Sequence, residues 1–139
     1  MRARAAVVAI ALTALCACFR NAGRTPPETT PVVVTMSGEL HEACVLPAEG
    51  RGAPRFQYRG WALETGADRS LEHLARCLAS GPLKDATVRV TVRNNEADLA
   101  RKRAAAVKAY LVQLGVPPAN VLETVTADGA GVTVERVAQ

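Results

Sequence analysis

One stretch of the sequence, residues 88–114, constrains the fold more than any other. Val88, Val90 and Val92 alternate with polar residues, which is the pattern of a strand with one buried face. Beyond a short loop, apolar side chains recur at helical spacing: Leu99, Ala106, Val107, Tyr110, Leu111 and Leu114. Gly115 and Pro117 end this repeat. A strand followed so closely by an amphipathic helix favours a layered fold in which the helix packs against the sheet.

Weaker patterns on either side complete the expected fold. Apolar residues at helical spacing in residues 71–78 predict a second helix, which ends at Gly81. Asn95 is the predicted N-cap of the long helix, with Asp98 reaching back. A short helix is expected at residues 37–44, and strands are expected at residues 32–35, 56–58, 120–126 and 132–137. The order strand, helix, strand, helix, strand, strand (βαβαββ) predicts an α+β fold: a mixed β-sheet with two helices packed on one face.

The N-terminus is typical of a secretion signal. Arg2 and Arg4 form a positive n-region, and residues 5–15 form an uncharged apolar run. Because that run is about half of the ~20 residues that a membrane-spanning helix needs, export with cleavage is favoured over a permanent span. We expect residues 1–18 to be a signal peptide.

The end of this signal resembles a bacterial lipobox. In the sequence Leu-Cys-Ala-Cys at residues 15–18, Cys18 is the residue expected to accept the lipid. A competing box ends at Cys16, and ordinary signal cleavage without a lipid is the other alternative. Attached acyl chains contribute ~0.8 kcal/mol per buried CH₂, so they hold a protein on a bilayer without a spanning helix. The expected product is a lipoprotein anchored in the cell outer membrane and facing the periplasm.

Two further segments follow the signal. Residues 19–37 are expected to form a flexible tether, because up to about residue 31 they are rich in Arg, Asn, Gly, Thr and Pro and offer little apolar surface to bury. Residues 38–139 are expected to form one domain, since this length suits a single hydrophobic core.

Charge and motif content exclude several function classes. Residues 1–18 contain two of the 17 basic residues and none of the 13 acidic ones, so the remainder is close to neutral. No Lys/Arg run is interleaved with aromatic residues, and nucleic acid is therefore not an expected partner. No serine has a histidine partner by motif, and residues 129–131 are too short to cradle phosphate. We expect neither an enzyme nor a bound cofactor.

Three segments of the chain carry a recognisable pattern. They are residues 77–84 (Cys-Leu-Ala-Ser-Gly-Pro-Leu-Lys), residues 88–92 (Val-Arg-Val-Thr-Val) and the motif Leu-x-x-x-Arg-Ala-x-x-Val-x-x-Tyr-Leu in residues 99–111. Together they resemble the C-terminal OmpA-like, peptidoglycan-associated domain family, over roughly residues 56–137. The resemblance implies the βαβαββ fold and non-covalent binding of peptidoglycan, which would link layers of the envelope.

The resemblance also implies which residues hold that ligand. In the family, an arginine on the second long helix and an aspartate in a Gly-x-Thr-Asp loop bind the diaminopimelate carboxylates of peptidoglycan. The arginine falls on Arg103, whose guanidinium can pair bidentately with a carboxylate, and Arg93 and Asn94 are its expected neighbours. The aspartate loop is missing, because residues 93–96 (Arg-Asn-Asn-Glu) lead directly into the helix. The alternative is therefore a degenerate domain that serves as a structural or protein-interaction module without binding peptidoglycan.

Two cysteines remain outside the signal. An oxidising export compartment favours a disulfide between Cys44 and Cys77, which in the chain-entropy model stabilises the fold by ~3–4 kcal/mol. The alternative is a zinc site, because His41 and His73 each stand three or four residues before one of these cysteines. The oxidising compartment disfavours free thiolates, so the disulfide is the prediction and no metal is expected.

Overall fold

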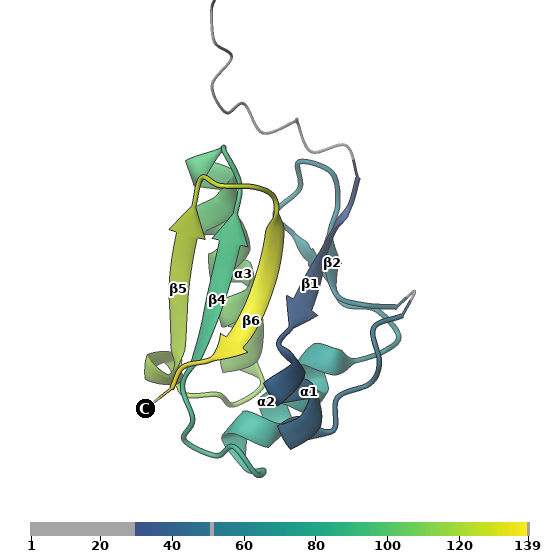
Figure 1. Cartoon of the computed structure of the whole chain (residues 1–139), viewed down its shortest axis with the longest axis vertical. Coiled ribbons are helices and arrows are strands. Elements are labelled where there is room, and N and C mark those ends of the chain that lie inside the picture. The colour runs from purple at the N-terminus through teal and green to yellow at the C-terminus, as the bar shows by residue number, and fades with distance from the viewer. Residues whose placement is uncertain (1–29, 51, 139) are drawn as a thin grey trace, which may run out of the picture.

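Residues 30–50 and 52–138 are described by a computed structural model (Figure 1). The predicted signal peptide, both candidate lipidation sites and residues 19–29 of the tether lie outside these described residues. The elements are β1 (Val32–Met36), α1 (Gly38–Cys44), β2 (Arg55–Phe56), β3 (Leu63–Glu64), α2 (Ser70–Ala79), β4 (Val88–Arg93), α3 (Ala97–Gln113), a 3-10 turn (Pro118–Asn120), β5 (Val121–Thr126) and β6 (Gly131–Arg136).

The strands form one mixed sheet in the order β3-β2-β1-β6-β4-β5. β4 pairs in parallel with β5 and antiparallel with β6, while β6 pairs in parallel with β1. β2 and β3 extend the sheet beyond β1 as antiparallel strands of two residues each. The predicted α+β class with a mixed sheet is confirmed. From β2 onward, the elements follow the predicted βαβαββ order, with the short β3 added.

The core lies between the sheet and the helices. Val88, Val90 and Val92 of β4 are fully buried, as their alternation with polar residues predicted. α3 packs against β4 and β5 and covers the back of the sheet in Figure 1, and α2 contacts both α3 and α1. The buried side of α3 consists of Leu99, Ala100, Arg103, Ala104, Val107 and Leu111. Among the described residues, no helix combines the length and apolar composition needed to cross a membrane.

A disulfide joins Cys44, the last residue of α1, to Cys77 in α2, with their Cα atoms 5.5 Å apart. The predicted pairing is therefore confirmed. An isolated helix of seven residues is unstable in water. α1 is held instead by this covalent link and by Leu40, which is completely buried in the core.

Two local predictions require correction. Part of the segment expected to be a tether, residues 19–37, is a strand: β1 occupies residues 32–36, and its Val34 and Met36 are buried in the sheet. Asn95 does not cap α3. Instead, the Asn94 Oδ1 accepts a hydrogen bond of 2.8 Å from the backbone N–H of Glu96, the residue that precedes the helix. The N-cap residue is Glu96, one residue later than predicted, and its side chain makes no cap hydrogen bond. The bond to Asn94 orders the turn into the helix rather than the first helical N–H groups.

Candidate functional site

Arg103, the residue that the resemblance marks for ligand binding, lies inside the protein. Its side chain is 1% exposed and is the largest fully buried side chain among the described residues. The Nε atom donates a hydrogen bond of 2.8 Å to the carbonyl oxygen of Gly60, and Nη2 donates one of 3.3 Å to that of Gln57. The guanidinium carbon also lies 5.3 Å from the ring centre of Phe56. Two of the donors expected to face a carboxylate therefore bind backbone carbonyls.

These contacts give Arg103 a structural task. Residues 57–60 form the turn that leaves β2, and Arg59 adopts a left-handed backbone conformation in it, with φ of 53°. A buried guanidinium is costly unless its donors are satisfied. By binding two carbonyls three residues apart, Arg103 fastens this turn to α3. The predicted ligand residue is thus a positioning residue for the turn.

The other two predicted ligand residues do not join Arg103. Arg93 is exposed and ends β4, where its position in the register places it on the opposite face of the sheet from Val92. Asn94 is buried and orders the start of α3 through the hydrogen bond described above. The three residues expected to form one site are therefore divided between a buried contact, the open sheet face and a loop.

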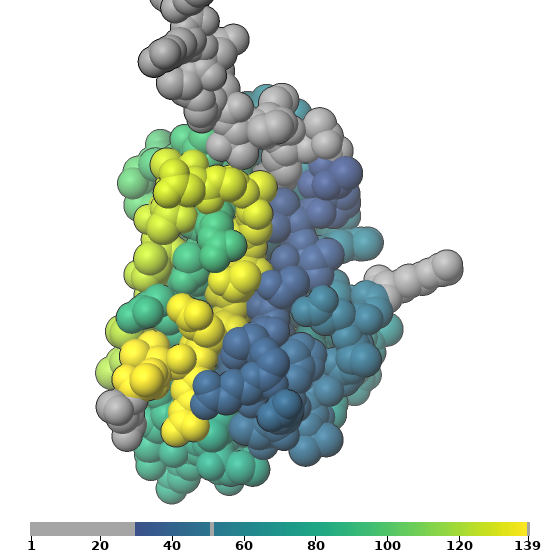
Figure 2. All heavy atoms as spheres, viewed as in Figure 1, coloured from purple at the N-terminus to yellow at the C-terminus, as the bar shows by residue number. Residues whose placement is uncertain are grey.

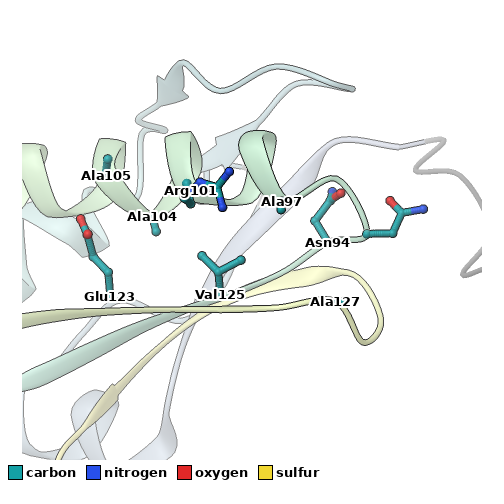
Figure 3. A pocket seen from close by; sticks show the side chains of 9 residues that line it. Asn94, Ala97, Arg101, Ala104, Ala105, Glu123, Val125 and Ala127 are labelled. Atoms are coloured by element: carbon teal, nitrogen blue, oxygen red, sulfur yellow. The ribbon is translucent and has the colours of Figure 1, made fainter.

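A different concavity lies on the other side of α3. A groove of about 680 Å³ runs between α3 and β5 (Figure 3). Its lining is mostly small or apolar, with polar side chains among it. The residues that line it are Asn94, Asn95, Ala97, Arg101, Ala104, Ala105, Glu123, Val125 and Ala127. Of the predicted ligand residues, Asn94 is the one found there.

The lining of this groove carries both signs of charge. Arg101 projects from α3 and contacts Asp98 one turn earlier. Glu123 lies on β5 in register with Val90, so its carboxylate points from the strand toward the helix, as Figure 3 shows. Because these side chains come from different walls, a ligand in the groove meets a guanidinium on one side and a carboxylate on the other.

The strand beside the groove has an open edge. Among the described strands, β5 is the last of the sheet and pairs with β4 on one side only. Its outer edge therefore presents backbone donors and acceptors to solvent, next to a groove wide enough for side chains. This combination of a strand edge and a helix-walled groove suits an extended peptide, which can pair with the strand while its side chains enter the groove.

The sequence reasoning did not identify this groove. The available signal was the run of alanines at residues 104–106, of which Ala104 is buried, Ala105 is exposed and Ala106 is half-buried. Small side chains on the helix face next to a strand leave space that larger ones would fill. Periodicity depends on which positions are apolar and not on the volume of their side chains, so it predicts the helix but not the groove.

The zinc site, which was the alternative to the disulfide, is not formed in this structure. Cys44 and Cys77 are joined to each other, so neither sulfur is a free thiolate ligand. Within residues 30–50 and 52–138, no group of three or more His, Cys, Asp or Glu side chains is placed to hold a metal ion.

Comparison of the chain with protein-family models, with curated proteins and with solved structures finds no significant match in any of the three.

Proposed function

We propose that this chain is an exported, lipid-anchored envelope protein whose domain binds the peptide part of peptidoglycan non-covalently in the groove between α3 and β5. The lipid is attached at Cys18 and residues 19–31 form the tether. The likeness of the sequence to OmpA-like domains supports a cell-wall ligand. The geometry supports the groove as its site, in place of Arg103.

The groove carries this proposal because its chemistry complements a cell-wall peptide. The side chain of diaminopimelate ends in both an ammonium and a carboxylate. Arg101 offers charge-assisted hydrogen bonds to the carboxylate, and Glu123 offers them to the ammonium. The small side chains of Ala104 and Ala105 leave room for the alanine residues of such a peptide, whose backbone runs along the free edge of β5.

A binding experiment with matched variants tests the proposal. The mature protein is incubated with purified sacculi and titrated with muropeptides released from them. Arg101→Ala removes a charge-assisted contact worth about 1.5–3 kcal/mol and should weaken muropeptide binding about tenfold or more. Ala105→Leu should block the groove. The controls are Lys102→Ala, an exposed neighbour of Arg101, and Ala109→Leu, an exposed position one helical turn beyond Ala105 and outside the groove lining.

A second function has its own supporting observation. The Arg103 guanidinium binds backbone carbonyls of the turn after β2. This favours a degenerate domain that has the fold but serves as a structural or protein-interaction module. The exposed face of β4 is then the expected contact surface, although Arg89 on it already pairs with Glu135 at 3.8 Å. Folded protein that binds neither sacculi nor muropeptides would leave this second function standing and the first refuted.

A further inference from the structure

The turn that Arg103 fastens, together with residue 61 that follows it, presents two exposed aromatic side chains. Trp61 is 55% exposed and Tyr58 is 51% exposed, in a chain that has one tryptophan and two tyrosines. Core packing does not explain either side chain. Tryptophan and tyrosine are the residues that favour boundaries between an apolar phase and water, because each combines an apolar ring with a polar group.

Hydrogen bonds hold the backbone of the turn, and basic side chains lie next to it. The two hydrogen bonds from Arg103 hold the carbonyls of Gln57 and Gly60, so the backbone that carries the two aromatic residues is fastened before any partner arrives. Lys102 lies with its Nζ 5.8 Å from the centre of the Trp61 ring. Arg59 stands between the two aromatic residues in the sequence, and its guanidinium lies 3.6 Å from the Glu96 carboxylate. Aromatic rings next to Lys and Arg complement the boundary between lipid tails and anionic headgroups.

The turn also lies at the end of the domain that is nearest to the predicted anchor. Phe56 pairs antiparallel with Val32, so the chain that leaves β2 passes the residues that enter β1. Figure 1 shows the turn after β2 at the same end of the sheet as the start of β1. Residues 19–29 separate Cys18 from Thr30. At no more than about 3.6 Å per residue they span roughly 40 Å at most, which keeps this end close to the bilayer.

We propose that Trp61 and Tyr58 dock the domain onto the surface of the bilayer that holds the Cys18 lipid. This inference rests on the lipid anchor of the proposed function. The acyl chains hold the protein on the membrane, and the aromatic turn sets its orientation. The rings insert at headgroup depth and Lys102 contacts lipid phosphates, while Arg59 is held beside them in its pair with Glu96. In this orientation the carboxyl ends of β4 and β5 lie at the end of the sheet that faces the bilayer. Figure 2 shows the compact body of the domain that is oriented in this way.

The single tryptophan makes the test direct. The full mature protein, with Cys18 lipidated, is reconstituted in vesicles of phosphatidylethanolamine and phosphatidylglycerol with and without brominated acyl chains. Docking predicts a blue shift of Trp61 emission and a loss of that emission in the brominated vesicles. The matched control is Leu122→Trp in a Trp61→Phe background. Leu122 is also exposed, but it pairs with Arg89 at the start of β4, at the opposite end of the sheet from the turn.

Each outcome separates the two proposals. Stronger quenching at Trp61 than at the control position supports docking, and equal quenching at both positions overturns it. A blue shift without quenching by brominated lipid means that protein covers the turn, which also overturns it. Mass spectrometry of the same sample reports the lipid on Cys18. If that lipid is absent, the anchored function fails, whereas lipidated protein with unquenched Trp61 refutes docking alone.

Discussion

Replacing Arg103 with methionine tests the structural role assigned to this residue. Methionine is apolar and fills part of the same buried space, but it loses both hydrogen bonds to the turn and the guanidinium that lies over the Phe56 ring. Hydrogen bonds from a charged donor contribute about 1.5–3 kcal/mol each. Because Gln57 is exposed and Gly60 half-buried, water can replace the guanidinium at both carbonyls, which places the loss at the low end of that range, about 3 kcal/mol in total.

Two measurements on the same Arg103→Met protein check this estimate. The midpoint of urea unfolding should fall by roughly 1–3 M, given an m-value of about 1–3 kcal/mol per M for a small domain. Acrylamide quenching of Trp61 in the folded state should increase, because the turn that carries it is no longer fastened. The control is Arg76→Met, an exposed arginine on α2, which should change stability by about 0.5 kcal/mol or less. A variant as stable as the parent, with unchanged quenching, would refute the role of Arg103.

Two further predictions concern covalent linkage and ionisation. Alanine at both Cys44 and Cys77 should lower the free energy of unfolding by about 3–4 kcal/mol, since the bond closes a separation of 33 residues, and equal denaturation curves for variant and oxidised parent would contradict this. Burial raises the pKa of Tyr110 above its ordinary value of 10.0, and the nearby Glu72 carboxylate raises it further. Because the pKa is higher in the folded state, the protonated tyrosine contributes stability below pH 10. That stability is lost as the pH rises through the folded-state pKa. Ultraviolet titration of a Tyr58→Phe protein, in which Tyr110 alone titrates, should give a midpoint above 10.0, and a midpoint at or below that value would be inconsistent with its burial.

The fold was largely predictable because its main elements are amphipathic. The alternation in β4 and the helical repeat in α3 each encode which face is buried, and a buried face determines the element. The neighbours of β1 could not be read in the same way. A run of valines predicts a half-buried strand, but it does not predict that this strand lies between β2 and β6. β3 has two residues, which is too short to show a period.

The candidate site was less predictable, and Arg103 shows why. The motif placed this residue correctly on α3. The role of Arg103 in ligand binding was predicted from the motif and from no other feature of the sequence. The position of Arg103 in the helical repeat indicates burial instead, because Leu99 and Val107 lie one turn before and one turn after it on the buried side of α3. The partner of Arg103 lies more than 40 residues away in a loop without periodicity. Sequence position therefore predicted burial, whereas the backbone carbonyls that satisfy the guanidinium required the tertiary structure.

The position of β6 in the sheet affects the order in which this protein can fold. β6 is the strand that joins β1 to β4, so without it the strands before α2 share no backbone pairing with β4 and β5. Val34 pairs with Val132, which makes the closing contact one of the most distant in the chain. Such contacts form late, because closing a long loop costs entropy before any pairing compensates. A chain that emerges stepwise from its N-terminus therefore cannot finish folding until its last strand has emerged.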